Sequence, residues 1–447
     1  MPSPYISNTD ADRTEMLKAI GVSSSADLFL DIPEAYRDPA LDIPKPLSEM
    51  ELLRELKALA RHNADLEDYA CFLGAGSYNH YIPSVVRHIT GRSEFYTSYT
   101  PYQAEISQGT LQATYDFQSL VCRLTGMDVA NAGMYDGSTA LAEAALMACR
   151  VTRRKRVIAL DTVSPGYLEI LNSYMGPQDI EVQVVPPSAL KVTEETACVI
   201  CQYPDFYGII EDLAPYAEAS HRAGALLVAS ADPIALGMFR SPGEYGADIV
   251  VGEGQCMGTS PIFGGPYLGL FATRSRHLRQ MPGRIVGKTT DARGRDGFVL
   301  TLQTREQHIR RETATSNICT SEALVALAST AYLAALGPRG LRKVAQLSYH
   351  KAHYAAQQIA ALPGYSLPSE GTFFKEFVIQ CPRPPSEINR ALLRDNIIGG
   401  LDITNSARPE PVEGLNPRVP NIMLLCVTEM NTRDQIDSLV HALSKLS

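Results

Sequence analysis

The stretch 247–269, "ADIVVGEGQCMGTSPIFGGPYLG", combines a buried strand, an irregular turn and a glycine-rich approach to a second strand. Its first strand is apolar throughout, as expected where both faces of a sheet are covered. In several enzyme classes the turn after such a strand carries a lysine that forms an imine with a cofactor. No lysine is present here. The turn is therefore either an ordinary connection or a catalytic centre whose central residue has been replaced.

Short β-rich runs alternate with helical periods around this stretch. The candidate strands are "DVANAG", "KRVIALD", "IEVQVVP", "ACVICQY", "ALLVAS", "DIVVG" and "PYLGLFA". Strand–helix alternation predicts a mainly parallel sheet between layers of helices, which is the α/β fold class. The last two strands are too close in sequence for a crossover helix, so one edge or one strand is expected to be antiparallel.

The pattern divides the chain into three parts. Residues 1–65 are expected to form a helical arm with little core of its own, and residues 66–330 a large domain around the sheet. Residues 331–447 are expected to form a small C-terminal α+β domain, in which the proline-rich stretch 406–420 is a surface loop without catalytic function. The final helix is the best specified element. It has a capping box, Thr432 with Gln435, and an apolar stripe made of Ile436, Leu439, Val440, Leu443 and Leu446.

The composition is that of an ordinary globular protein, with 45% hydrophobic residues and a formal net charge of -9. No dense basic run could follow a phosphate backbone, which argues against a general nucleic-acid binder. Neither a secretory signal nor a membrane span is visible. The nine cysteines lack framework spacing and are typical of reduced thiols, so a cytoplasmic location is expected. No metal site is expected.

Two short motifs are better explained by structure than by chemistry. Cys198 and Cys201 form a C-x-x-C pair, but they lie in a predicted strand, where residues three apart point to opposite faces. The stretch 283–290, "GRIVGKTT", resembles a nucleotide-phosphate loop. It has one residue too few between its glycines, so nucleotide hydrolysis is not expected.

A third set of residues fits a pyridoxal phosphate (PLP) fold. Enzymes of that kind hold the phosphate at a helix N-terminus and protonate the pyridine nitrogen with a carboxylate at a strand end. "YDGSTALAEA" places Gly137, Ser138 and Thr139 at a helix start, and "LLVASADP" places Asp232 directly after a strand. Each residue alone is better explained as a helix cap or a turn residue, and only their order and placement together favour the PLP fold. After the next strand, where the lysine belongs, the chain offers Gln255 and neighbours that cannot form an imine.

Two further stretches are unusually polar and aromatic for plain scaffolding. The candidate residues of stretch 93–109 are Tyr96, Tyr99, Tyr102, Gln103, Glu105 and Gln108. Those of stretch 304–320 are Arg305, His308, Arg310 and Arg311. Arginine binds carboxylates through two parallel hydrogen bonds, whereas tyrosine and arginine are also favoured in subunit interfaces. Both interpretations hold if an active site lies at an interface.

These motifs closely resemble a known family. "FLGAGSYNHYIPSVV", "SYTPYQAEISQGTLQATYDFQ", "GMDVANAGMYDGSTALAEAALMA", "FGGPYLGLFAT" and "GFVLTLQTREQHIRRETATSNICT" are similar to the glycine cleavage system P-protein, in its subunit 1 (α) type. The resemblance runs from "YISNTDADRTEMLKAIG" to the final helix, and the stretch 406–420 is its one clear departure. It implies a fold-type-I PLP-transferase-like architecture. Subunit 2 then carries lysine-bound PLP in a signature similar to "NLHKTFSTPHGGGGPG", and that lysine falls on Gln255 when the two are aligned without gaps.

The resemblance also implies the reaction, which is decarboxylation of glycine by glycine dehydrogenase. The aminomethyl group passes to the lipoyl arm of the H-protein, and the assembly is a heterotetramer of two α and two β subunits. No residue of this chain is then expected to be catalytic or to bind a cofactor covalently. The stretches 93–109 and 304–320 would face the partner's active site, and the residues around Asp232 and Gln255 would be a vestigial cofactor pocket. The alternative is a purely structural scaffold for the PLP-bearing subunit.

Overall fold

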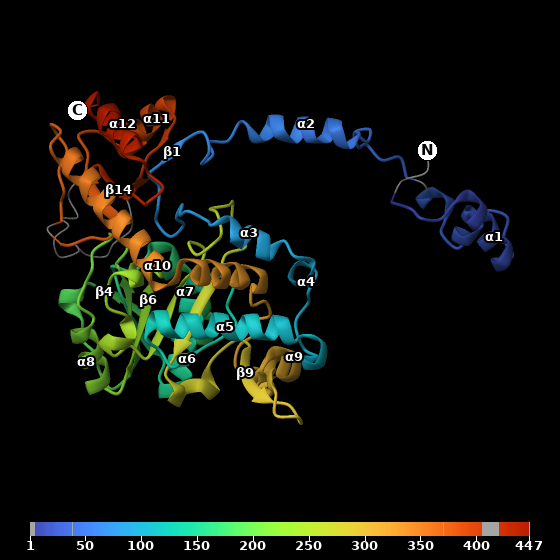
Figure 1. Ribbon diagram of the computed structural model, residues 1–447, viewed down its shortest axis with the longest axis horizontal. Helices are drawn as coiled ribbons and strands as arrows, with labels where there is room; N and C mark the ends of the chain where they lie inside the picture. Colours follow the sequence, from blue (N-terminus) through green and yellow to red (C-terminus); the bar gives the residue numbers. More distant parts are fainter. Residues whose placement is uncertain (1–4, 38, 370, 405–419, 447) are drawn as a thin grey trace. The chain divides into compact units, whose positions relative to one another are not determined.

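The computed structural model describes residues 5–37, 39–369, 371–404 and 420–446 of the 447-residue chain (Figure 1). It contains two compact units, residues 1–63 and 64–447, and each is described by itself. The predicted division of the second unit near residue 330 remains a prediction. The stretch 406–420, predicted as a surface loop, lies outside the described residues except for Pro420.

The first unit consists of short helices without a hydrophobic core. Helix α1 spans Asp10–Ile20 and α2 spans Glu49–Ala60. Each begins with a capping box, which satisfies N–H groups that a helix start otherwise leaves free. None of the described side chains of this unit is buried, and leucines of α2 such as Leu53 and Leu56 stay exposed. Local capping therefore defines these helices, not burial.

A seven-stranded sheet forms the centre of the second unit, in the order β2-β8-β7-β6-β5-β3-β4. Strands β3 to β7 pair in parallel, whereas β8 is antiparallel to β7 and to β2. All seven predicted strands take part, and they span Val129–Ala130 (β2), Arg156–Leu160 (β3), Glu181–Val185 (β4), Thr196–Tyr203 (β5), Leu226–Ala231 (β6), Ile249–Glu253 (β7) and Gly269–Thr273 (β8). The α/β fold class and the antiparallel strand are both confirmed.

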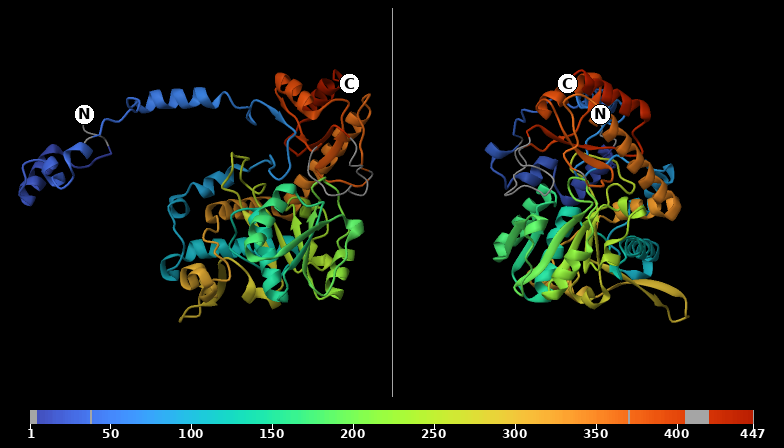
Figure 2. Two further views of the ribbon diagram at one scale, coloured as in Figure 1. Left: turned by 180° about the vertical axis from the view of Figure 1, so that it is seen from behind. Right: turned by 90° about the vertical axis from the view of Figure 1, so that its left-hand side faces the viewer.

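Helices cover both faces of this sheet (Figure 2). One face carries α5 (Gln108–Thr125) and α8 (Ala214–Arg222), and the other carries α6 (Gly137–Thr152) and α7 (Pro165–Met175). Cys201 of β5 packs in the first core and Cys198 in the second, as the two-residue period of a strand requires. The C-x-x-C pair therefore consists of core residues on opposite faces, and all nine cysteines are free thiols.

Helix α10 (Ala323–Ala360) leads from the sheet to the C-terminal part of the unit. It is kinked at Gly337, which has a φ of 58° and precedes Pro338. By length and composition alone α10 could cross a membrane. Its buried residues, such as Ala326 and Ile359, belong to two hydrophobic cores of the unit, which is the behaviour of a core helix.

The C-terminal part packs two helices against a small antiparallel sheet, in the order β11-β14-β13. Its elements are β11 (Glu376–Gln380), α11 (Pro385–Leu392), β13 (Leu401–Asp402), β14 (Ile422–Cys426) and α12 (Arg433–Ser444). The predicted capping box of Thr432 and Gln435 is present at α12. The start of the unit joins this part as well, because β1 (Ala70–Cys71) pairs in parallel with β12 (Ile397–Ile398).

Three further segments complete the surroundings of the sheet. Helices α3 (Ser84–Thr90) and α4 (Ser93–Tyr96) precede α5, and α9 (Gln307–Arg310) precedes α10. Strands β9 (Ile285–Thr290) and β10 (Asp296–Thr301) form an antiparallel hairpin. Most of the "GRIVGKTT" stretch is thus a hairpin strand and not a phosphate loop.

Candidate functional site

The residues predicted for a vestigial cofactor pocket lie at the carboxyl ends of β6 and β7 and at the start of α6. They are Gly137, Ser138, Thr139, Asp232 and Gln255, and we call this region the cofactor-like pocket. Open α/β sheets bind their ligands at this edge. A small cavity is present there, and its lining includes Tyr78, Tyr167, Asp232 and Glu253. The structure therefore brings the predicted residues together at one edge of the sheet, and their origin as a cofactor pocket stays a prediction.

Two carboxylates hold the N–H groups at the start of α6. Asp136 is the N-cap, and its Oδ1 accepts from the N–H groups of Ser138 at 2.8 Å and Thr139 at 3.0 Å. The Oε2 of Glu253, at the end of β7, accepts from the N–H of Gly137 at 2.9 Å. The three predicted donors do point to one site, but they donate to side chains of this same chain. The capping residue is Asp136, not Ser138 or Thr139.

Glu253 lies among three backbone donors in a poorly hydrated position. Its Oε1 accepts from the N–H groups of Gln255 at 2.9 Å and Leu268 at 3.0 Å, in addition to the bond from Gly137. Burial raises the pKa of Glu253 to about 7, although the three backbone hydrogen bonds act in the opposite direction. The sequence marked Glu253 only as a residue that cannot form an imine. Its place among these donors follows from the packing of β7 against α6.

Asp232 is paired with a lysine from the C-terminal part of the unit. Its Oδ1 accepts from the N–H of Ile234 at 2.8 Å, which is the turn role that the sequence left open. Its Oδ2 lies 2.7 Å from Nζ of Lys375, whose side chain is only 1% exposed. Burial by itself lowers the pKa of Lys375, but neighbouring groups, Asp232 foremost, raise it overall and keep the lysine charged. No sequence pattern identified Lys375.

His80 and Glu429 extend the pair into a buried network. The Nζ of Lys375 lies 3.4 Å from the centre of the Tyr78 ring and 3.1 Å from Nε2 of His80. Because an ammonium can only donate, Nε2 accepts, and the opposite ring nitrogen, Nδ1, carries the proton that is donated to Oε2 of Glu429 at 2.7 Å. Burial, followed by the charge of Lys375, lowers the pKa of His80, which agrees with a neutral ring. Among the described residues, no group of His, Cys, Asp and Glu side chains is arranged to hold a metal ion.

Gln255 stands at the position where the family resemblance implies a lysine in the other type of subunit, and its amide is fully used in hydrogen bonds. The side chain is completely buried. Its Oε1 accepts from the N–H of Tyr78 at 2.9 Å, and its Nε2 donates to the carbonyl oxygens of Tyr78 at 3.0 Å and Thr259 at 2.6 Å. These bonds tie the segment before α3 to the turn after β7. Gln255 is therefore a structural link, and it has no amine that could form an imine.

The stretch 93–109 presents large aromatic side chains to solvent. Tyr96 and Tyr99 are 68% and 85% exposed, and Gln103 and Glu105 are exposed beside them. Gln108 differs from the expectation of a free polar group. Its amide pairs with the backbone of Phe298 in β10, accepting from the N–H at 2.9 Å and donating to the carbonyl oxygen at 2.8 Å. It anchors the β9–β10 hairpin to the start of α5.

The cations of stretch 304–320 mainly bind the chain itself. The guanidinium of Arg305 donates to the carbonyl oxygens of Met281 and Gly283. This clamp holds the connection between β8 and β9, which differs from the anion-positioning role that the residue type suggested. Arg310 donates from Nε to the carbonyl oxygen of Thr304 at 3.1 Å, and its side chain stays exposed. Arg311 is exposed as well, with a φ of 52° that is uncommon outside glycine.

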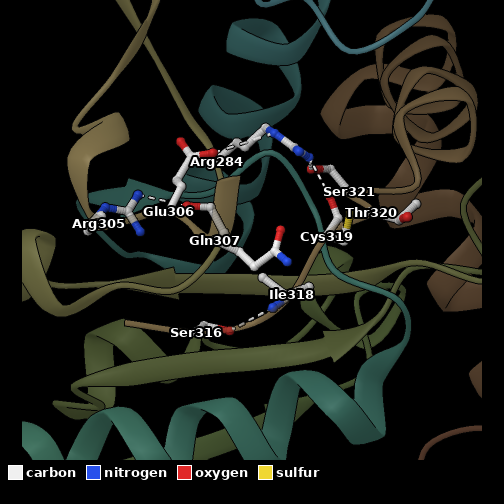
Figure 3. Close-up of a pocket in the computed structure, with 10 residues that line it drawn as sticks. Arg284, Arg305, Glu306, Gln307, Ser316, Ile318, Cys319, Thr320 and Ser321 are labelled. Carbon is white, nitrogen blue, oxygen red and sulfur yellow. Dashed lines mark hydrogen bonds and ion pairs between the residues drawn. The ribbon is translucent and has the colours of Figure 1, made fainter. Parts of the chain in front are cut away.

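Arg284, which the sequence did not single out, joins the two stretches. Figure 3 shows its side chain beside Glu306 and Cys319 of stretch 304–320. One guanidinium nitrogen donates to the carbonyl oxygen of Cys319 at 2.6 Å and the other to the hydroxyl of Tyr102 at 3.2 Å. Its Nε lies 3.6 Å from Oε2 of Glu306, a buried carboxylate whose pKa is raised by burial. The Tyr102 ring also lies 5.1 Å from the ring of His308. The two predicted stretches thus form one surface, with Arg284 beneath it.

The fold of the second unit is the one seen in fold-type-I PLP-dependent enzymes. It is similar to the sphingosine-1-phosphate lyase of Burkholderia pseudomallei K96243, with a TM-score of 0.63 and 15% sequence identity over 93% of this chain and 94% of that one. At this identity the likeness shows the fold alone. The same architecture occurs in a C-DES variant with glycine covalently linked to its PLP cofactor, at a TM-score of 0.60.

Closer relatives show the family. The glycine cleavage system P-protein family matches residues 3–443. The chain is 53% identical to the probable glycine dehydrogenase (decarboxylating) subunit 1 of Thermomicrobium roseum, over 98% of each chain. It is 51% identical to the protein of the same name from Desulforamulus reducens, over 99% of this chain and 100% of that one. A crystal structure of glycine decarboxylase (P-protein) in inhibitor-bound form matches with a TM-score of 0.89 and 42% identity over 100% of both chains. The chain belongs to the glycine cleavage system P-protein family.

Proposed function

We propose that this chain is the subunit of a decarboxylating glycine dehydrogenase that has no Schiff-base lysine, and that it completes the active site of a PLP-bearing partner. The family match over residues 3–443 and the names of the relatives support this assignment. Gln255 at the lysine position, fully engaged in hydrogen bonds, supports the division of labour between two subunits. The assembly is then a heterotetramer of two α and two β subunits in the cytoplasm.

In this proposal the partner subunit carries out the reaction, and this chain covers the partner's active site. The partner's PLP supplies the electron sink for decarboxylation of glycine, and the lipoyl arm of the H-protein receives the aminomethyl group. This chain covers the partner's site with the surface formed by stretches 93–109 and 304–320. Tyr99 and Glu105 exclude water and orient the substrate or the lipoyl arm there, because both side chains are exposed on that surface.

The proposal rests mainly on stretch 93–109, in which exposed tyrosines lie beside a tyrosine that is held by a hydrogen bond. Large aromatic side chains at 68% and 85% exposure, Tyr96 and Tyr99, stand next to Tyr102, which Arg284 holds in place. Aromatic residues that are exposed on a supported backbone are typical of surfaces that a partner covers. The alternative proposal is a purely structural scaffold, which uses the same surface for assembly alone.

The two proposals are separated by measuring assembly and chemistry on the same variants. The chain is purified together with the PLP-bearing subunit, and exchange of labelled carbon dioxide into glycine is followed with H-protein present. Tyr99→Ala and Glu105→Ala are each expected to reduce exchange by at least tenfold while the complex keeps its size in sedimentation. Glu218→Ala, an exposed glutamate on α8, is the matched control and should leave exchange unchanged. If both test variants form the complex and show normal exchange, the proposed active-site contribution is refuted and the scaffold proposal stands.

A further inference from the structure

A PLP site in this fold depends on three anchors, and the chain has a counterpart of each. The anchors are N–H donors at the start of a helix for the phosphate, a carboxylate for the pyridinium nitrogen, and a lysine for the aldehyde. The first two survive in this chain as the start of α6 and as Asp232, and Gln255 has replaced the third. The fit of the cofactor therefore depends on whether the two surviving anchors are available.

The phosphate anchor is already in use. The N–H groups of Gly137, Ser138 and Thr139 all donate to carboxylates. Gly137 donates to Glu253, and the other two donate to Asp136. Glu253 also accepts from two loop N–H groups, so that its carboxyl oxygens lie within a ring of three backbone donors. A phosphate that entered here would lose these donors and would face two carboxylates at close range. The helix start does not fit a second anion.

The pyridinium anchor is in use as well. Asp232 holds a buried cation, the ammonium of Lys375, at 2.7 Å. The same ammonium lies over the face of the Tyr78 ring and against Nε2 of His80, so it has polar or π-electron partners on several sides. A pyridinium could reach Asp232 only by displacing an ammonium that is itself without access to water. The residues present therefore do not fit PLP.

We infer that Glu253 and Lys375 are built-in replacements for the cofactor, with the carboxylate of Glu253 in place of the phosphate and the ammonium of Lys375 in place of the pyridinium. The carboxyl oxygens of Glu253 accept hydrogen bonds as phosphate oxygens would, and the ammonium of Lys375 gives Asp232 a cationic partner as a pyridinium would. The replacement also resolves a problem that loss of the cofactor creates. Without a replacement, Asp232 would be a largely buried carboxylate with no counter-charge, and the N–H of Gly137 would be a buried donor with no acceptor. The pocket is closed to pyridoxal phosphates, whether bound as an imine or without one.

This inference concerns the folded chain itself, and it does not depend on the proposed contribution of Tyr99 and Glu105 to catalysis. The probe is pyridoxine 5'-phosphate, which has the ring nitrogen and the phosphate but no aldehyde. Binding to the full chain is measured by equilibrium dialysis. The wild-type chain should show no saturable binding at millimolar concentrations. PLP followed by borohydride, with peptide mass spectrometry, should place no pyridoxyl group on Lys375.

Substitutions should reopen each anchor separately. Glu253→Ser frees the N–H groups of Gly137, Gln255 and Leu268, and should create a phosphate-dependent site. Glu253→Gln keeps an acceptor in the same volume and should create none, which makes it the matched control. The double variant Glu253→Ser/Lys375→Met should bind pyridoxine 5'-phosphate at least tenfold more tightly than Glu253→Ser does. Its affinity for benzyl phosphate, which lacks the ring nitrogen, should be the same as that of Glu253→Ser.

Two results would overturn the inference. One is saturable binding of pyridoxine 5'-phosphate, or pyridoxyl labelling of Lys375, in the wild-type chain. The other is a Glu253→Ser chain with an unchanged circular dichroism spectrum that binds phosphate esters no better than Glu253→Gln. The wild-type measurement decides the matter on its own if the double variant does not fold.

Discussion

Replacing Lys375 by methionine tests the most consequential contact of the cofactor-like pocket. The substitution keeps the length and most of the apolar volume of the side chain and removes only the ammonium. Asp232 then remains as a carboxylate whose side chain is 12% exposed and whose counter-charge, formerly 2.7 Å away, is gone. Breaking a buried ion pair in this way destabilises a protein by about 3–5 kcal/mol, because the remaining charge is left uncompensated.

The chain provides a matched control. Lys288 and Asp296, on the β9–β10 hairpin, form a pair of the same residue types at the same 2.7 Å, but with side chains 46% and 64% exposed. Water and salt screen such a pair, so Lys288→Met should leave the free energy of unfolding unchanged within error. Urea unfolding of the full chain, followed by circular dichroism, compares the two variants.

A double-mutant cycle shows whether the loss comes from the pair itself. Asp232→Asn alone strands the ammonium of Lys375 and should also destabilise the chain strongly. The double variant, which has neither charge, should be more stable than the sum of the two single losses predicts, with a coupling of about 1–3 kcal/mol between sites in contact. Additive losses, or a Lys375→Met effect as small as that of Lys288→Met, would refute the interpretation of Lys375 as a buried counter-charge.

Three further outcomes are expected. The pKa of Glu253 in the folded chain is about 7, above its ordinary value of 4.5, so the native chain binds this proton more tightly than the unfolded chain. The free energy of unfolding should therefore fall as the pH rises from about 4.5 to about 7. Glu253→Gln should flatten this dependence in urea titrations at several pH values, though not abolish it, since Glu376 is shifted in the same direction to about 6. Arg284→Ala should remove the bonds to Cys319 and Tyr102 and expose stretch 304–320 to limited proteolysis, with wild-type cleavage kinetics counting against its role. Gln255→Lys should give no imine absorbance with PLP and should lower the melting temperature, since three hydrogen bonds of a buried amide are lost.

Local sequence signals indicated the residues of the cofactor-like pocket but not the two side chains, Glu253 and Lys375, that interact with them. Asp232 and Gln255 follow apolar strands directly, so their place at the carboxyl edge of the sheet could be predicted from strand pattern and chain order. Lys375 could not be predicted, because it precedes a strand of the C-terminal part and reaches Asp232 only through the packing of that part on the sheet. The role of Glu253 has the same origin, since its hydrogen-bond partners lie on α6 and in the loop before β8.

The stretches 93–109 and 304–320 show what residue type alone leaves out. The sequence singled out both stretches, and the structure brings them into contact through Tyr102 and His308, but their functional role stays a prediction. Arg305 and Gln108, however, form their hydrogen bonds with backbone atoms. Nearby carbonyl and N–H groups need partners when they are buried, and residue type alone does not show that these side chains supply them. No local pattern indicates the role of Arg284, because its partner Tyr102 lies 182 positions away in the sequence.

The pairing of β1 with β12 constrains how the second unit can be made. Phe72, just after β1, is fully buried in the core of the C-terminal part, and its N–H donates to the carbonyl oxygen of Ile398 at 2.8 Å. On the ribosome this residue emerges hundreds of positions before its partners, so the C-terminal core cannot close until nearly the whole chain has been synthesised. The β1 segment therefore has no pairing strand until β12 has been synthesised. Expression of the sheet-bearing portion without the C-terminal part would leave Phe72 without its core, and such a truncated chain should associate with chaperones or aggregate.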